Sequence, residues 1–159
     1  MARPVLWRVI YGSSSPPLNP ILAARASQIT IQPALLHDFC RKRVRHADYP
    51  ATIPQKGERV RGTYVTGLTD NDMARLDYFE GSDYTRQKVQ VVLLPEGETD
   101  AAPDAKEVDT ETYVFTAGDH GLEEGEWDFE HFVRHRIGFW ADASDEYEGE
   151  LDYMCMAVV

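Results

Sequence analysis

The residues best placed to do chemistry surround a predicted helix end, with Glu80 at their centre. Met73, Leu76 and Phe79 recur every three residues and predict the apolar face of a short helix. Glu80 follows at once, where the helix dipole disfavours a negative charge. Because a carboxyl group beside apolar side chains has a raised pKa, it can accept a proton near neutral pH. We therefore take Glu80 as a candidate proton acceptor; the alternative is a solvated carboxylate at a helix end.

Further carboxylates stand close to Glu80 in the sequence. Asp77 precedes it by three residues and Asp83 follows it by three. Such a group can bind a divalent cation, but the Asp-x-Asp-x-Asp-Gly loop of a calcium site is missing. We predict no metal site here, and we expect Arg86 to pair with one of these acids rather than with a substrate.

Two other groups have spacings known from catalytic or metal sites. His131 and His135 stand four residues apart, but Phe132 occupies the position that a zinc protease motif gives to glutamate. Cys40 lies three residues after His37, and a buried structural cysteine is the simpler interpretation. We therefore predict no metal site at either group.

A glycine- and serine-rich segment comes early in the chain, at Tyr11, Gly12, Ser13 and Ser14. Backbone N–H groups of such a loop can bind an oxyanion or a carboxylate. Many connecting loops share this composition. We take these four residues as candidate substrate-binding residues.

The predicted elements alternate short helices with strands of period two. Residues 6–11 read as a strand or part of a short helix, and Asn19 and Pro20 open a helix over 20–26. Thr69 caps the helix that carries Glu80, with Asp72 completing a capping box. The remaining predictions are a strand over 29–37 with Pro33 at an edge or bulge, an irregular stretch over 38–57, strands over 59–66, 84–94 and 110–116, a loop over 95–109 and a helix over 127–140.

This order favours an α+β fold. Neighbouring strands read as hairpins, and strands do not alternate regularly with helices. We predict one domain over residues 1–142, followed by an acidic, disordered tail over 143–159.

Composition narrows the function classes. The 159 residues carry a net charge of −11, divided into +7 over residues 1–62 and −18 over 63–159. The basic run 41–45 has no interleaved aromatic residues, so a solvated strand facing the acidic half is favoured over nucleic-acid binding.

No apolar run reaches membrane-spanning length, and we see no secretory signal. Two cysteines do not make a disulfide framework. We expect a cytoplasmic protein without nucleic-acid or membrane partners; the oligomeric state stays open.

Several segments resemble one known family, the γ-glutamylcyclotransferase-like proteins and within them the plant and fungal avirulence-induced branch. The similarity runs from about Val5 to about Trp140. The segments that carry it are Thr66-Gly-Leu-Thr-Asp70, Leu76-Asp-Tyr-Phe-Glu80-Gly-Ser-Asp-Tyr84-x-Arg86-x-x-Val89-x-Val91, Glu111-Thr-Tyr-Val114 and Gly125-Glu-Trp-Asp-Phe-Glu130.

The resemblance implies a small mixed β-barrel of about five to seven strands with flanking helices. It also implies an acyltransferase in which Glu80 is the catalytic acid/base. In that chemistry the α-amine of a γ-glutamyl group attacks its own γ-carbonyl, 5-oxoproline closes, and an amine or amino acid leaves. The partner implied is a small γ-glutamyl substrate, and no cofactor is implied.

One departure concerns the substrate loop. The family has a Tyr-Gly-(Ser/Thr)-(Leu/Phe) loop after its first strand, and Ser14 stands where an apolar residue is usual. The segment 1–6 moreover resembles the residues directly after that loop in fungal relatives. We slightly favour the interpretation that the true first strand and loop lie upstream of this chain. The alternative functions are a non-catalytic or truncated member that binds a small ligand or partner, and a hydrolase in which Glu80 activates water.

Overall fold

The computed structural model describes residues 2–118 and 121–142. The helices are α1 (Arg3–Tyr11), α2 (Pro20–Ala26), α3 (Asp70–Glu80), α4 (Phe129–His135) and α5 (Ile137–Asp142), and the strands are β1 (Thr30–Val44), β2 (Pro50–Thr66), β3 (Tyr84–Leu93), β4 (Glu107–Phe115) and β5 (Leu122–Glu126). The α+β class predicted from the sequence is confirmed. The predicted tail, residues 143–159, lies outside the described residues.

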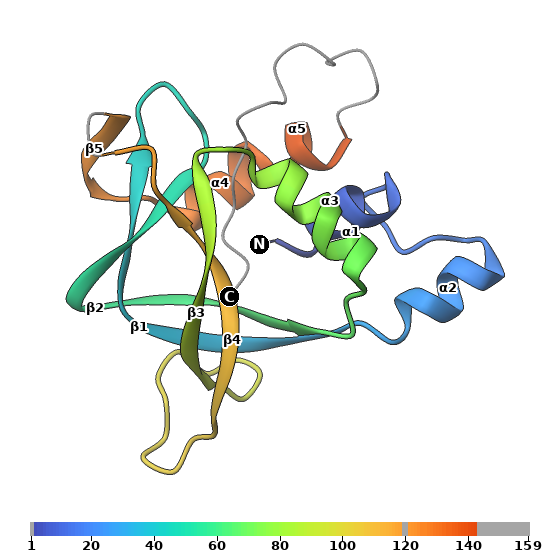
Figure 1. Cartoon of the computed structure of the whole chain (residues 1–159), viewed down its shortest axis with the longest axis horizontal. Coiled ribbons are helices and arrows are strands. Elements are labelled where there is room, and N and C mark those ends of the chain that lie inside the picture. Colours follow the sequence, from blue (N-terminus) through green and yellow to red (C-terminus); the bar gives the residue numbers. More distant parts are fainter. Residues whose placement is uncertain (1, 119–120, 143–159) are drawn as a thin grey trace.

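One antiparallel sheet organises the structure. Its strand order is β2-β1-β3-β4, and β5 pairs with the C-terminal end of β1. The strands at the two ends of this order, β2 and β4, also touch, so the sheet curls around one side of the core. The helices α1, α3 and α5 gather beside the sheet, and α2 projects from them (Figure 1).

Local sequence explains where the helices begin. Asn19 accepts hydrogen bonds from two backbone N–H groups of α2, and Pro20 occupies its first position, as predicted. The capping box of α3 is also confirmed: the Thr69 side chain accepts from the Asp72 backbone, and the Asp72 side chain accepts from the Thr69 backbone. Residues 6–11, for which a strand and a helix were both open, belong to α1.

The stretch over 38–57 corrects the sequence prediction. It was expected to be irregular, but β1 continues to Val44 and β2 begins at Pro50. The two strands form a long hairpin whose register shifts once, at Asp38, where φ is 61° and the carboxylate accepts the Gly57 N–H. Apolar and polar residues do not alternate over this stretch, so a period of two did not reveal the strands that the β1–β2 pairing defines.

Three smaller details also differ from the sequence predictions. Pro33 does not mark an edge strand, because β1 pairs on both sides; the Pro33 carbonyl accepts the Leu94 N–H, and the bulge lies at Asp38 instead. The last helix is interrupted at Arg136 and forms α4 and α5. The loop predicted over 95–109 is shorter because β4 begins at Glu107, and β5 was not predicted at all.

The largest core cluster lies between the helices and the sheet. Its buried members include Leu6 and Ile10 of α1, Leu76 of α3 and Phe132 of α4. Within the residues that the structure describes, no helix is long and apolar enough to cross a membrane. The core thus fixes α3, and with it Glu80, against both α1 and the sheet.

Candidate active site

Glu80 is the last residue of α3 and lies in the interior. Its side chain is only 2% exposed. The predicted stripe Met73, Leu76 and Phe79 holds only in part: Leu76 is buried and the other two are half-buried. The fully buried positions are Asp72, Leu76 and Glu80, which are spaced by four residues and lie on one helix face. The fold therefore shelters the carboxyl group that the sequence singled out.

The helix ends immediately after Glu80. Gly81 adopts φ 69° and ψ −167°, and its N–H donates to the Asp77 carbonyl at 3.1 Å. A residue with a Cβ atom rarely adopts this positive φ. The glycine thus turns the chain directly into β3, which brings the start of β3 beside the end of α3.

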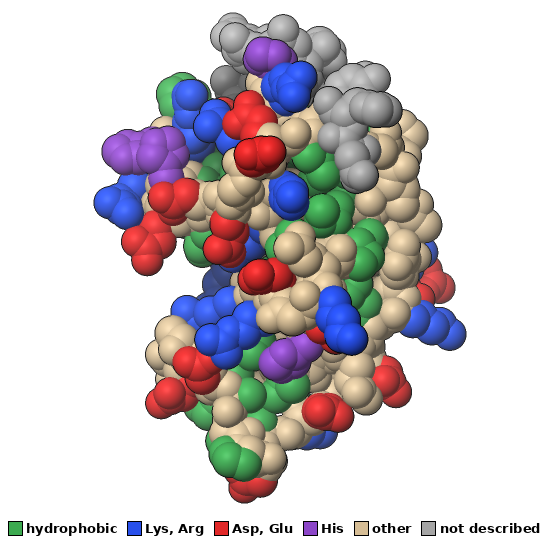
Figure 2. All heavy atoms as spheres, turned by 90° about the vertical axis from the view of Figure 1, so that its left-hand side faces the viewer, with side chains coloured by type: hydrophobic (Ala, Val, Ile, Leu, Met, Phe, Trp, Pro, Cys, Tyr) green, Lys and Arg blue, Asp and Glu red, His purple; other side chains and the backbone are tan. Residues whose placement is uncertain are grey.

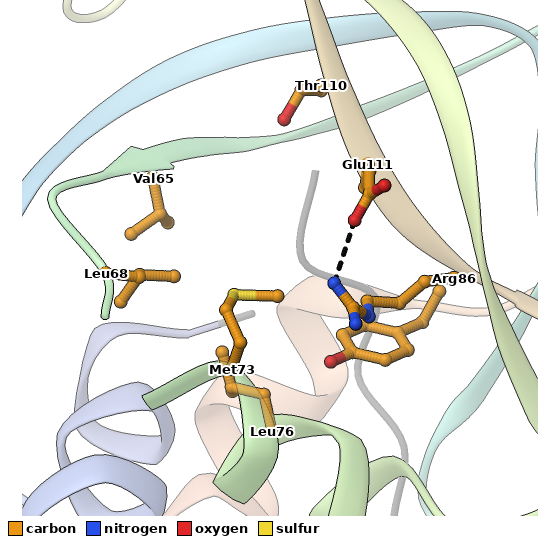
Figure 3. Close-up of a pocket in the computed structure, with 8 residues that line it drawn as sticks. Val65, Leu68, Met73, Leu76, Arg86, Thr110 and Glu111 are labelled. Atoms are coloured by element: carbon orange, nitrogen blue, oxygen red, sulfur yellow. Dashed lines mark hydrogen bonds and ion pairs between the residues drawn. The ribbon is translucent and has the colours of Figure 1, made fainter. Parts of the chain in front are cut away.

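A cavity of about 240 Å³ borders the same face of α3. Its lining residues are Val65, Leu68, Met73, Leu76, Arg86, Thr110, Glu111 and Tyr113. Figure 3 shows Val65, Leu68 and Met73 on one side of this cavity and the ion pair of Arg86 with Glu111 across from them. Leu76 lines the cavity and lies one helical turn before Glu80, which is buried behind it and is not among the described residues that line the cavity.

A polar cluster fixes the wall of the cavity next to Glu80. The Tyr113 hydroxyl donates to Asp77 at 2.6 Å. The Arg86 guanidinium contacts Asp77 at 2.8 Å and Glu111 at 2.8 Å. The expectation that Arg86 pairs with one of the nearby acids is confirmed. The cluster ties the last turns of α3 to β3 and β4.

The pKa of Tyr113 reflects the burial and the charges of this cluster. Its side chain is buried, and burial is the main reason that the pKa of Tyr113 lies far above its usual value. The hydrogen bond to Asp77 and the negative charges of Asp77 and Glu80 raise that pKa further, whereas Arg86 lowers it. Glu80 and Arg86 therefore both act on the same phenol from close range.

The candidate loop residues lie elsewhere. Tyr11 ends α1 and lines a second cavity, of about 270 Å³, together with Arg25, Asp72 and Arg75. Its charged neighbours are Asp72 and Arg25. Asp72 precedes Glu80 by eight residues, which is about 12 Å along the helix axis. Tyr11 thus lies beside the first half of α3 and Glu80 at its other end.

The rest of that segment does not form a cradle for Glu80 either. The Gly12 N–H is used within α1, where it donates to the Arg8 carbonyl at 2.7 Å. The Ser15 N–H approaches the Ser13 hydroxyl at 3.4 Å, and Gly12 and Ser13 are exposed, while Ser14 is half-buried. The segment taken as a candidate substrate-binding loop thus forms the end of a helix and the turn after it.

The other groups considered from the sequence stay apart from Glu80. His131 and His135 lie on α4 with ring centres 4.7 Å apart. Among the described residues, no three His, Cys, Asp or Glu side chains come together as a potential metal site. Cys40 is a free, half-buried thiol on β1.

The basic run 41–45 lies on the last part of β1 and just beyond it. Arg43 contacts Glu123 of β5 at 3.7 Å, and Arg41 stacks over Trp127. Lys42 pairs with Glu126 in the β1–β5 ladder. Lys and Arg side chains alternate with Asp and Glu over this side of the molecule (Figure 2). The positive charge of this run is thus interleaved with residues from the acidic half.

Known proteins are similar to this chain in sequence and in fold. Residues 9–129 match the model of the γ-glutamyl cyclotransferase, AIG2-like, family. The chain belongs to this family. Protein AIG2 B of Arabidopsis thaliana is 34% identical over 138 residues, which are 87% of this chain and 76% of that protein. Protein AIG2 C of the same plant is 34% identical over 123 residues, covering 76% of this chain and 68% of that protein.

Two solved structures of the family extend the comparison. One Arabidopsis thaliana solution structure has a TM-score of 0.53 and 32% identity, covering 77% of this chain and 71% of the other. A second has a TM-score of 0.50 and 28% identity, covering 69% of each chain. The resemblance read from the central segment is confirmed, and so is the α+β fold that it implied.

The structure adds residues that the sequence did not single out as site residues. Tyr113 and Glu111 line the cavity, and Asp77 joins Tyr113 to Arg86. The signal was the segment Glu111-Thr-Tyr-Val114, which carried part of the family resemblance without an assigned role. Only the antiparallel register, in which Arg86 pairs with Tyr113, shows that these side chains meet.

Proposed function

We propose that this chain is a γ-glutamylcyclotransferase-type acyltransferase that closes a γ-glutamyl group to 5-oxoproline. The observation that carries the proposal is the position of Glu80: an interior carboxyl group one helical turn beyond Leu76, which lines the cavity. Membership in the γ-glutamyl cyclotransferase, AIG2-like, family supports it independently.

The chemistry requires a single proton shuttle. The Glu80 carboxylate accepts a proton from the α-ammonium of the donor, and the freed amine attacks the γ-carbonyl carbon. A ring C–N bond forms and the bond to the leaving nitrogen breaks. The ring nitrogen keeps one hydrogen and the leaving nitrogen gains two, delivered through Glu80, so donor and products balance without water.

Burial suits Glu80 to this role. A carboxyl group shielded from water holds its proton more readily than an exposed one. It can then both accept and return a proton near neutral pH. The attack is intramolecular, so holding the donor in a folded conformation supplies much of the rate enhancement.

The test is product identity from a panel of donors. Purified protein is offered γ-glutamyl amino acids and γ-glutamylamines, and both 5-oxoproline and free glutamate are measured. The proposal expects 5-oxoproline without glutamate. Free glutamate instead would indicate a hydrolase that activates water through Glu80. A folded protein that forms no product from any donor would indicate a member that only binds a ligand.

A further inference from the structure

We propose that Arg86 binds the α-carboxylate of the γ-glutamyl donor, taking it in place of Glu111. The inference rests on the proposed function and deepens it, because it names the residue that would select donors with an α-carboxylate. Among the described residues that line the 240 Å³ cavity, Arg86 is the one Lys or Arg.

The geometry of the donor places this requirement close to Glu80. The α-ammonium that gives its proton to Glu80 and the α-carboxylate are bonded to the same carbon atom. A cation for the carboxylate must therefore lie within a few bond lengths of the Glu80 site. Arg86 contacts Asp77 at 2.8 Å, and Asp77 precedes Glu80 by three residues on α3, so Arg86 lies near the helix end that carries Glu80.

One of the two acids on Arg86 is fixed. Asp77 accepts from Arg86 Nε at 2.8 Å and also accepts the Tyr113 hydroxyl at 2.6 Å. Tyr113 is 4% exposed, so the donor of this bond is held in place by packing. Asp77 therefore orients the guanidinium and leaves its Nη1 side directed toward the cavity.

The other acid is easier to displace. Glu111 accepts from Arg86 Nη1 at 2.8 Å. The side chains of Asp77 and Glu111 are both 43% exposed, so the hydrogen bond from Tyr113 to Asp77 is what distinguishes the two acids. An exposed ion pair contributes little net stability because water and salt screen it. Figure 3 shows this pair at the cavity, with the Glu111 side chain reaching in from β4. The planar guanidinium fits a carboxylate with two parallel hydrogen bonds, so a donor carboxylate can replace the Glu111 carboxylate on it.

The decisive test compares two donors that differ only in the α-carboxylate. One is a γ-glutamylamide and the other is the matching 4-aminobutyramide, which closes to 2-pyrrolidinone. In Arg86→Gln the KM for the γ-glutamylamide should rise at least about tenfold, since a charge-assisted contact is lost. The KM for the 4-aminobutyramide should stay within about twofold. Equal losses for both donors would overturn the inference and leave Arg86 a structural residue.

Glu111→Gln serves as the matched variant. It removes the competing charge without removing Arg86, so the KM for the γ-glutamylamide should fall about two- to fivefold. A structural role for the Arg86–Glu111 pair would not lower KM, and an unchanged or raised KM would count against the inference. Circular dichroism checks that both variants are folded. Arg86→Lys, which keeps the charge but not the planar fork, replaces Arg86→Gln if the latter does not fold and should give an intermediate KM.

Binding separates this inference from the proposed function. 5-Oxoproline and 2-pyrrolidinone, which differ by the same carboxylate, are titrated against wild type and Arg86→Gln and followed by amide NMR shifts. If no donor is turned over but wild type prefers 5-oxoproline and Arg86→Gln does not, the inference stands and the proposed function fails. If turnover occurs and Arg86→Gln keeps the preference, the inference fails and the proposed function stands.

Discussion

Asp72 offers a sharp test of what holds the helix that carries Glu80. Its side chain is 6% exposed and accepts three hydrogen bonds: from the Thr69 N–H at 2.8 Å, the Thr69 hydroxyl at 2.7 Å and the Arg25 guanidinium at 2.7 Å. Asp72→Ala removes the acceptor of all three bonds at once. It also leaves the guanidinium of Arg25, which is partly exposed, with only the Gly67 carbonyl.

These three hydrogen bonds set the expected loss in the free energy of unfolding. A neutral hydrogen bond contributes about 0.5–1.5 kcal/mol net, and one that involves a charged group about 1.5–3 kcal/mol. All three bonds end on a carboxylate, but Arg25 can turn partly toward water, and alanine is a better helix former than aspartate. We expect Asp72→Ala to lower the free energy of unfolding by about 3 kcal/mol.

Asp70→Ala is the matched control. Asp70 lies in the same first turn of α3 but is exposed. It stabilises α3 only through the helix dipole, so its loss should cost about 0.5 kcal/mol. Urea unfolding followed by tryptophan fluorescence measures both, with the denaturant slope expected to stay unchanged. Losses for the two variants within about 0.5 kcal/mol of each other would refute the reasoning.

Two further predictions concern the elements around α3. Gly67 has a φ of +82°, and the Cβ added in Gly67→Ala would overlap the Gln28 carbonyl. Gly57 has a similar φ of +87°, but the Cβ added in Gly57→Ala meets no atom within 4 Å. We expect Gly67→Ala to lower the free energy of unfolding by more than about 3 kcal/mol and Gly57→Ala by about 1 kcal/mol. Equal losses would contradict the close approach of the Gly67 and Gln28 backbones. Burial raises the pKa of Tyr113 above the ordinary value of 10.0, so the stability that depends on its protonated form is complete below about pH 10 and declines above it. Tyr113→Phe should therefore show a shallower decline than wild type in urea unfolding between about pH 9 and 11, and parallel curves would refute this.

The helices and the central strands were accessible from sequence because their signals are local. Thr69 with Asp72 marks the start of α3 by capping chemistry, and Asn19 with Pro20 marks α2. The strand containing Val89 and Val91 shows the alternation of a half-buried sheet. These signals depend on neighbours in the chain, so a single sequence contains them.

The second half of β1 and the start of β2 were missed for a physical reason. Residues such as Gln55, Lys56 and Glu58 are exposed strand residues that carry no hydrophobic period. The ladder with β1 pairs the residues on either side of them, Pro54 with Phe39 and Arg59 with His37. Long-range backbone pairing overrides composition here, and a single sequence does not encode it locally.

The site divides along the same line. Glu80 was identified because it follows an apolar stripe and because the helix dipole disfavours a negative charge at a helix C-terminus. Tyr113 and Glu111 join the site only through the register of β3 with β4, and the sequence placed no side chain of β4 beside α3. For the segment around Gly12 the sequence left a substrate loop and a lookalike both open, because the end of a helix and an anion-binding loop share glycine and serine.

The central claim is that the buried Glu80 carboxyl carries the proton between donor and leaving group. Glu80→Gln keeps the shape of the side chain and removes the titrating group, and Glu98→Gln, at an exposed loop position, is the matched control. With the best γ-glutamyl donor at saturation, kcat for 5-oxoproline formation should fall by about 10²–10⁴ in Glu80→Gln, with KM little changed. It should be unaffected in Glu98→Gln. A folded Glu80→Gln protein that forms 5-oxoproline at the wild-type rate would contradict the account.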